Sequence, residues 1–193
     1  MEKKFDWNDI SIVAGTLGYN DSRSEFNAKT KDGYLPLFTA PMDMVIDKNN
    51  AKDFLESGIN VCLPRNVKWA DLEDDRFFYS YGLDEIIQLY ENKEFIPKRV
   101  LIDIANGHLN KLLTFSKKIK KELGNNIELM VGNIANPKTY KLYCKAGVDY
   151  IRVGIGGGSA CTTSANGGVH YPMASLVNEC YKISKNFKKP TKI

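Results

Sequence analysis

The sequence predicts an α/β domain in which parallel strands alternate with amphipathic helices. Short apolar runs recur along the chain, stretches with helical spacing of apolar residues lie between them, and brief glycine or proline signals separate the two. Continuous apolar runs are typical of strands buried on both faces of a parallel sheet. The 193 residues are 43% hydrophobic and 26% charged, so a sizeable core is expected without disulfides or metals.

The predicted elements follow one another at regular spacing. Two short extended runs come first, Ile10–Val13 and Tyr34–Thr39. The predicted strands are Leu37–Ala40, Ile59–Leu63, Val100–Ile104, Ile127–Val131 and Tyr150–Val153. Glycine and proline mark the predicted helices: one ends before Gly58, one spans Leu112 to Leu123 and ends at Gly124, one runs from Asn136-Pro137 to Gly147, and one opens at Pro172.

The strand spacing is that of a (β/α)8 TIM barrel, although such barrels typically take about 250 residues. Only about five βα units are visible here, and the residues from Lys188 to Ile193 look like the lead-in to a further strand. We therefore expect an incomplete TIM barrel that forms a single domain over residues 1–193, either a fragment or a barrel completed by another polypeptide. An open doubly wound sheet is the alternative, because it needs no closure.

Charge and apolar content exclude several classes of protein. The 27 Lys+Arg against 23 Asp+Glu give a net charge of +4, and basic residues such as Lys117, Lys118 and Lys121 alternate with acids along helices. This pattern indicates a solvated face and no nucleic-acid partner. The N-terminus lacks an apolar signal region and no run of about 18 apolar residues occurs, so we expect no membrane segment and a cytoplasmic location.

A glycine-rich loop follows the predicted strand at Val153. It reads GIGGGSACTT and contains one of the four cysteines, Cys161. Glycines let backbone N–H and C=O groups approach a ligand closely, which suits a phosphate or a cation. Such loops are as often tight turns, but a thiol flanked by hydroxyl side chains indicates a reaction centre. The other cysteines, Cys62, Cys144 and Cys180, are predicted to be core residues.

Four segments resemble the IMP dehydrogenase/GMP reductase family in the same order. PLFTAPMDMV is similar to its first barrel strand, and IDIANGH to its Asp-x-Ala-Asn-Gly strand end. VGNIANPKTYKLYCKAGVDYIRVGIG resembles its Gly-Asn strand and following helix, and GIGGGSACTTSANGGVHYP its catalytic-cysteine loop. The resemblance covers most of residues 5–185. It implies a purine-nucleotide oxidoreductase whose active site lies at the carboxyl ends of barrel strands.

The resemblance also implies roles for three catalytic residues. Cys161 would attack C2 of the purine and form a covalent adduct, while hydride passes between C2 and a nicotinamide cofactor. Thr163 matches the threonine that positions water or ammonia, and Asp103 matches an aspartate near the nicotinamide and the substrate. An acid inside the apolar run Val100–Ile104 also costs energy unless it is paired or functional.

Further site residues follow from the same resemblance. The substrate-binding residues would be Ser159, which holds the phosphate, Met42, Asn133 and Gly158. The cofactor-binding residues would be Asp103, Asn106 and Gly107. Backbone carbonyls of Gly156, Gly158 and Cys161 would hold a potassium ion that favours the thiolate. Met42 fits a core position equally well. Arg65 stands where the reductases carry lysine, and His170 where they usually have glycine.

Two features favour the reductases over the dehydrogenases. The dehydrogenases usually insert a regulatory CBS pair after the second strand, whereas here only Pro64 to Lys98 separates the second predicted strand from the third. Cys-Thr-Thr and a Gly-Val-x-Tyr-Pro stretch are also typical of the reductases. We therefore expect NADPH-dependent reductive deamination of GMP to IMP. The alternative is oxidation of IMP to XMP with NAD⁺.

A second alternative is an inactive half-barrel that needs a partner chain. The family's remaining strands supply an Asp-Gly-Gly segment, a second phosphate loop and the acid that partners the threonine, and these 193 residues contain none of them. A chain without those groups loses transition-state stabilisation and exposes unpaired strand edges. The resemblance implies a purine-nucleotide ligand and a homo-oligomer, a tetramer.

Overall fold

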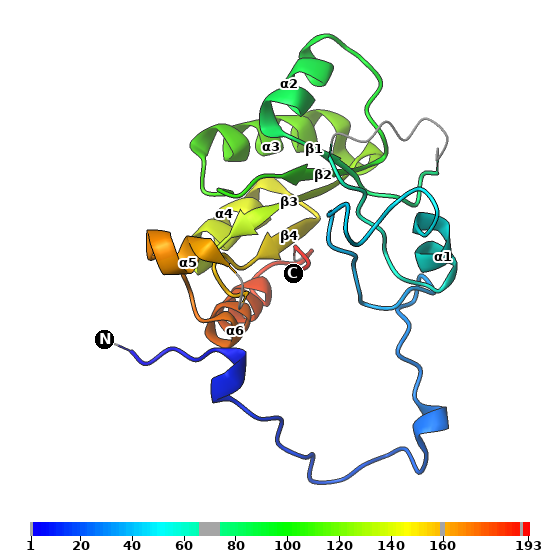
Figure 1. The fold of residues 1–193 in the computed structure, drawn as a ribbon, viewed down its shortest axis with the longest axis vertical. Helices are drawn as coiled ribbons and strands as arrows, with labels where there is room; N and C mark the ends of the chain where they lie inside the picture. The colour runs from blue at the N-terminus through cyan, green and yellow to red at the C-terminus, as the bar shows by residue number, and fades with distance from the viewer. Residues whose placement is uncertain (1, 66–73, 159–160, 190) are drawn as a thin grey trace. The chain divides into compact units, whose positions relative to one another are not determined.

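The computed structural model describes residues 2–65, 74–158, 161–189 and 191–193 (Figure 1). The chain divides into two compact units. Unit 1 comprises Met1–Ile10 and Tyr81–Ile193, and unit 2 comprises Ser11–Ser80. The expected site residues fall mostly in unit 1.

Unit 2 contains three extended segments that pair in parallel. Isolated bridges join Phe38 to Asn60 and Cys62 to Phe78. Helix α1 (Ala51–Glu56) lies between the first two segments in the chain, and the 3-10 helix η2 (Arg23–Glu25) precedes them. A small apolar core consists of Ile46, Ala51, Leu55, Val61, Leu63 and Phe77. The segments predicted as strands at 37–40 and 59–63 therefore pair only through isolated bridges. Too few of their residues pair to form regular strands.

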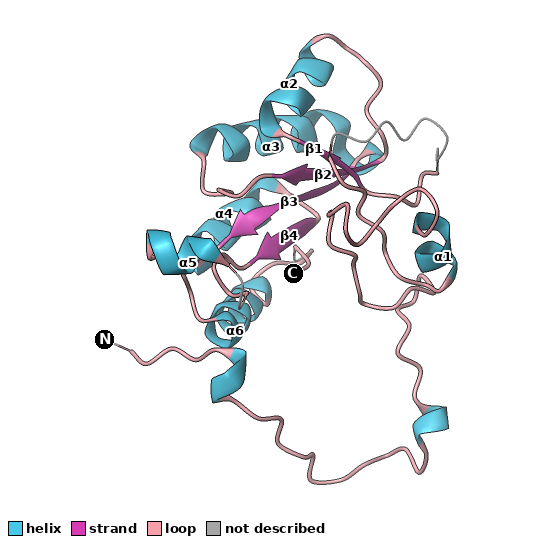
Figure 2. Cartoon of the chain, viewed as in Figure 1, coloured by secondary structure: helices cyan, strands magenta, loops and turns pink. Residues whose placement is uncertain are grey.

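Unit 1 is built on parallel strands, which confirms the predicted α/β class (Figure 2). Its strands are β2 (Arg99–Asp103), β3 (Glu128–Ile134) and β4 (Tyr150–Val153). The sheet order is β1-β2-β3-β4, where the short β1 (Tyr79–Tyr81) spans the boundary of the two units. Lys192 forms a parallel bridge with Tyr150, so the predicted lead-in to a further strand lies beside β4.

The helices begin and end largely where the sequence indicates. The helices of unit 1 are α2 (Leu83–Glu91), α3 (Asn110–Leu123), α4 (Pro137–Ala146), α5 (Thr162–Gly167) and α6 (Met173–Ser184), with 3-10 turns η1 (Trp7–Asp9) and η3 (Gly124–Asn126). The Asn136 side chain accepts the Lys138 N–H at the start of α4, and Gly147 ends that helix with φ +78°, the left-handed conformation that favours glycine.

Sequence analysis missed three elements. The β1–α2 pair lies in the stretch between residues 64 and 98, where β1 has only three residues and a central serine, too short for a periodic signal. Helix α5 follows the glycine-rich loop and has no apolar stripe. Strand β3 also extends to Ile134, three residues past its predicted end, so Gly132 and Asn133 lie in the strand and not after it.

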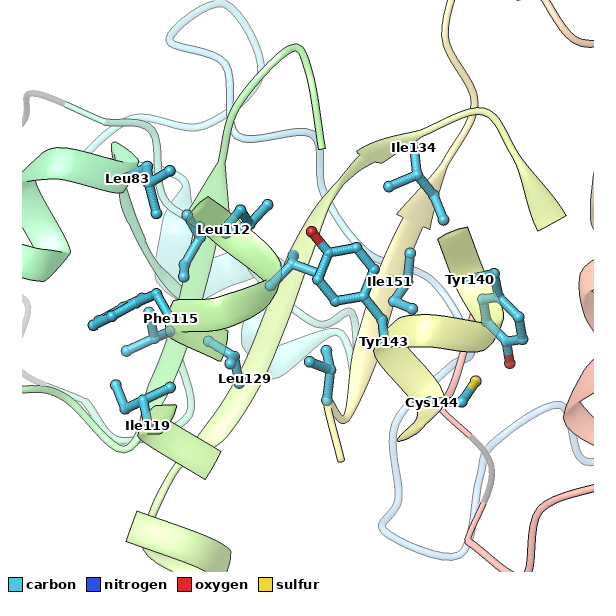
Figure 3. Packing of buried hydrophobic residues seen from close by; sticks show 14 of the residues in the cluster. Leu83, Leu112, Phe115, Ile119, Leu129, Ile134, Tyr140, Tyr143, Cys144 and Ile151 are labelled. Carbon is cyan, nitrogen blue, oxygen red and sulfur yellow. The ribbon is translucent and has the colours of Figure 1, made fainter. Parts of the chain in front are cut away.

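Alternate strand residues face a single layer of helices. Val100 and Ile102 of β2, Leu129 and Val131 of β3 and Ile151 of β4 belong to one buried cluster with residues of α2, α3, α4 and α6 (Figure 3). An open doubly wound sheet carries helices on both faces. Among the described residues of unit 1, these four helices share the core on one face of the sheet.

The intervening residues face the other side, because side chains alternate along a strand. They are Arg99, Leu101 and Asp103 of β2, Glu128, Met130 and Gly132 of β3, and Tyr150 and Arg152 of β4. Leu101 and Met130 are buried, at 0% and 3% exposure. Charged groups occur on this face at both ends of the strands: Arg99 and Glu128 form an ion pair at the amino ends, and Asp103 and Arg152 form one toward the carboxyl ends, where the expected site lies.

Candidate active site

An ion pair joins two strands at the carboxyl edge of the sheet. Asp103, the last residue of β2, pairs with Arg152 of β4, although β3 lies between them. In the strand register Asp103 stands opposite Gly132, and Gly132 opposite Arg152. A Cβ at Gly132 would lie 2.6 Å from the Cβ of Arg152. Only glycine at this position of β3 therefore leaves room for the Arg152 side chain to reach Asp103 on β2.

Sequence reasoning found the acid of this pair and missed the base. Arg152 interrupts the apolar run of β4 as Asp103 interrupts that of β2. The exposures of the two side chains are 22% for Asp103 and 29% for Arg152. The sequence signal that could have predicted the pair is one acidic and one basic residue, each near the carboxyl end of an apolar strand. The pairing explains how β2 accommodates a carboxylate.

Hydrogen bonds join the loop after β2 to β3, and join β3 to the start of the cysteine loop. The Asn133 Nδ2 donates to the Gly154 carbonyl at 3.0 Å. The Gly107 N–H donates to the Asn133 carbonyl at 2.8 Å. A Cβ at Gly107 would lie 2.6 Å from that carbonyl oxygen, so the loop requires glycine here. Asn133 and Gly107, both expected at the site, are thereby brought together.

His108 ties the same loop to the start of α4. The Ala135 N–H donates to the His108 Nε2 at 2.9 Å, and the His108 Nδ1 lies 3.1 Å from the Thr139 Oγ1. Because Nε2 accepts a hydrogen bond, the bonding assigns the proton to Nδ1. Burial lowers the pKa of His108, which favours this neutral form. The neighbouring Asn106 accepts the His108 N–H through its Oδ1 at 3.1 Å.

Cys161 stands at the N-terminal boundary of α5 and is half-buried. Its N–H donates to the Gly158 carbonyl at 2.9 Å, which closes a turn before the helix. Hydrogen bonds from the Thr163 hydroxyl and then from the Thr163 N–H lower the pKa of the Cys161 thiol, with further N–H groups from Ser164 and Gly156. Cys62, Cys144 and Cys180 are buried, which agrees with their predicted core positions. Cys161 therefore differs from the other thiols in exposure, and its lowered pKa contrasts with that of Cys180, which burial raises to about 12.

Two of the expected substrate residues lie outside the described part of unit 1. Met42 lies in unit 2, in a turn where its carbonyl accepts the Val45 N–H at 2.8 Å, and its side chain is 54% exposed. Its exposure contradicts the alternative of a core position. Ser159 lies outside the described residues. Their contacts with substrate stay predictions.

The described unit thus defines a class: a parallel α/β protein with an ionisable cysteine in a loop at the carboxyl ends of its strands. The model of the IMP dehydrogenase / GMP reductase domain matches residues 92–192, just over half of the chain. The chain belongs to this family. Among the described residues, no helix is long and apolar enough to cross a membrane.

Similar proteins include several named GMP reductase. That of Ligilactobacillus salivarius is 30% identical over 180 residues, which cover 85% of this chain and 55% of the relative. That of Staphylococcus epidermidis is 30% identical over 201 residues, covering 95% and 61%. GMP reductase 2 of Homo sapiens is 29% identical over 207 residues, covering 96% and 59%. The chain therefore spans little more than half the length of these relatives.

Proposed function

We propose that this chain is the cysteine-bearing part of an oxidoreductase that converts GMP to IMP by NADPH-dependent reductive deamination. The observation that carries the proposal is the Cys161 thiol, whose pKa is lowered by Thr163, in the loop that follows β4. The resemblance of the chain over most of its length to proteins named GMP reductase supports this choice of substrate.

The chain's own residues divide the chemistry between them. The Cys161 thiolate forms a bond to C2 of the purine, and the 2-amino group leaves as ammonia after it gains a proton. Thr163, beside the thiol, orients the departing ammonia. A bound nicotinamide cofactor supplies the hydride for C2. The bond from C2 to the Cys161 sulfur then breaks, which releases IMP and restores the thiolate.

The cofactor would lie against Asp103, Asn106 and Gly107. Arg152 fixes the carboxylate of Asp103, and the Gly107 N–H bond to Asn133 fixes the loop. Such fixed polar groups need no reorganisation when the ligand binds. Asn133 and Gly158 would contact the nucleotide, with Met42 and the phosphate-binding Ser159 as further predicted contacts.

Potassium suits the donor set of the cysteine loop. The proposed ligands are the backbone carbonyls of Gly156, Gly158 and Cys161, and carbonyl oxygens are ligands that replace the hydration shell of K⁺. The Gly158 carbonyl accepts the Cys161 N–H at 2.9 Å, and the Cys161 carbonyl accepts the Ser164 hydroxyl at 3.3 Å. Each carbonyl has two lone pairs, so these bonds leave capacity for a cation.

We further propose that the chain forms a partial TIM barrel, a single catalytic domain without an inserted CBS pair. The single helix layer of unit 1 and the start of a strand at Lys192 support this fold. Further sequence or a second polypeptide would complete the barrel. The whole protein would act in the cytoplasm as a homo-oligomer, a tetramer by family resemblance.

The test is an assay of the purified chain with GMP and NADPH, followed by loss of absorbance of the reduced nicotinamide. We expect GMP-dependent oxidation that Cys161→Ala abolishes, while calorimetric binding of GMP persists in that variant. Asn166→Ala, an exposed change on α5, is the matched control and should retain activity.

Two results would contradict the proposal. Reduction of NAD⁺ with IMP, without oxidation of NADPH by GMP, would assign the chain to the dehydrogenases. A folded chain that is silent in both assays and binds neither nucleotide would support the inactive half-barrel.

A further inference from the structure

Three residues near the N-terminus, Lys4–Asp6, dock on α6 within unit 1, and we call them the N-terminal strap. The Phe5 N–H donates to the Ser175 hydroxyl at 2.8 Å, and the Ser175 N–H donates to the Phe5 carbonyl at 3.0 Å. The Lys4 ammonium contacts Glu179 at 2.5 Å. The strap is thus held along the first two turns of the helix.

Asp6 uses both of its carboxylate oxygens at the start of α6. Oδ1 accepts the N–H of Met173, the first residue of the helix, at 2.7 Å. Oδ2 lies 2.8 Å from the Nε2 of His170, in the segment that leads from α5 to α6. The helix has no capping side chain of its own, because proline stands at its N-cap. Asp6, which lies 167 positions before Met173 in the chain, supplies that cap.

Met173 and the segment that carries His170 lie close to the glycines of the cysteine loop, and a Cβ at Gly156 would lie 3.5 Å from the His170 Cβ. A Cβ at Gly154 would lie 2.6 Å from the Met173 sulfur, and one at Gly157 would lie 2.9 Å from the Met173 Cγ. A Cβ at Gly156 would lie 2.5 Å from the Val169 carbonyl oxygen. The glycines of the loop thus leave space that Met173 and the backbone beside His170 fill.

The contacts continue to the nucleophile itself. The Gly156 N–H is one of the backbone donors directed at the Cys161 thiol. A path of direct contacts therefore leads from Asp6 through His170 and Met173 to the glycines, and from Gly156 to the sulfur. Lys4 belongs to the same strap, but it contacts Glu179, Glu2 and the Tyr171 ring, and these residues lie outside the loop.

We propose that Asp6 and His170 are positioning residues that hold residues 154–157 of the cysteine loop in the conformation in which the Gly156 N–H faces Cys161. The inference rests on the proposed role of Cys161 as the nucleophile. His170 stands where the reductases usually have glycine, so the histidine arm of this contact is a feature of this chain. The strap thereby acts on a reaction centre that it does not touch.

The test compares variants of the full 193-residue chain by the rate at which iodoacetamide alkylates Cys161 at one fixed pH. Mass spectrometry of the Cys161 peptide reads the rate, and hydrogen exchange of the loop peptides reads its mobility. For Asp6→Ala we expect alkylation about tenfold slower and faster exchange in the loop, because displaced N–H groups no longer favour the thiolate.

Matched variants separate positioning from simple loss of stability. Asp6→Asn should restore most of the rate, since the amide oxygen can accept the Met173 N–H and the amide nitrogen can donate to His170. Lys4→Ala should stay within about twofold of the parent, because it loosens the strap without releasing the loop. His170→Gly should slow alkylation about threefold. If Asp6→Ala does not fold, this variant tests the positioning role in its place.

The outcomes distinguish this inference from the proposed function. An unchanged or faster rate in Asp6→Ala, or in His170→Gly when the former does not fold, would overturn the positioning role. An equal loss in Lys4→Ala would do the same. If these rates behave as expected while the chain fails to oxidise NADPH with GMP, the proposed function fails and the positioning role stands.

Discussion

Two ion pairs lie at opposite ends of the same parallel sheet, and they differ in their surroundings. At the amino end, the Lys120 ammonium contacts Asp149 at 2.6 Å and donates to the carbonyls of Gly124 and Ile127, each at 2.9 Å. The side chains of this pair are 8% and 14% exposed. At the carboxyl end, Asp103 and Arg152 are 22% and 29% exposed.

We expect this difference in exposure to separate a pair that stabilises the fold from a pair that takes part in ligand binding. Asp149 also accepts the Leu129 N–H at 2.9 Å, so the amino-end pair is surrounded by hydrogen bonds that join α3, β3 and the start of β4. A buried pair of this kind becomes costly when one partner is removed. The carboxyl-end pair is more open to solvent and borders the cysteine loop. We expect the first pair to govern folding and the second to govern turnover.

The largest expected effect comes from breaking the amino-end pair. Lys120→Met should lower the free energy of unfolding by about 3 kcal/mol, because the buried Asp149 then keeps only the exposed Lys189 ammonium, 3.6 Å away, as a cationic partner. Urea unfolding measures this loss. The exposed neighbour Lys121→Met is the matched control and should change stability by less than about 0.5 kcal/mol. Equal losses in the two variants would show that the Lys120 pair is not a structural centre.

The carboxyl-end pair should show the opposite pattern. Asp103→Asn should change the free energy of unfolding by less than about 1 kcal/mol, since the pair is partly exposed. The same change should lower GMP-dependent NADPH oxidation by about 100-fold, because the cofactor loses a fixed carboxylate. Parallel urea unfolding and steady-state assays make the comparison. A large loss of stability with normal turnover would reverse the roles assigned to the two pairs.

A smaller effect is expected at the nucleophile. Thr163→Val removes the hydroxyl that contributes most to the lowered pKa of Cys161, so the thiol pKa should rise toward its ordinary value. Alkylation of Cys161 at neutral pH should then slow by more than about tenfold, a larger loss than in Asp6→Ala, because less of the thiol is ionised. The rate profile against pH provides the measurement, with Asn166→Ala as the control. A profile that does not move would remove Thr163 from this role.

The smallest effect concerns pH and His108. Burial places its folded-state pKa below the ordinary value of 6.5, so the folded state binds fewer protons than the unfolded chain in this range. Stability from this group is present at neutral pH and declines as pH falls through 6.5 toward the folded pKa. Protonation of Nε2 also breaks its bond with the Ala135 N–H. His108→Gln should show a smaller decline between neutral and acidic pH by thermal unfolding than the parent, and an equal decline would exclude His108 as its source.

Local signals explain why much of the fold could be predicted. Gly124, Asn136 and Gly147 mark helix ends through conformations and caps that depend on only a few neighbouring residues. Continuous apolar runs likewise identified β2 and β4. The β1–α2 pair was missed because a three-residue strand has too few positions for a pattern, and its pairing depends on residues far along the chain.

The sequence alone determined the family resemblance, the proposed nucleophile Cys161 and the candidate site acid Asp103, because each is an unusual residue type in a recognisable local setting. Only the tertiary structure decided which groups these residues meet. The pairing of Asp103 with Arg152 requires the register of β2 and β4 across Gly132. The contact of Asp6 with His170 joins residues 164 positions apart. Such contacts follow from packing of the whole chain, for which local sequence carries no signal.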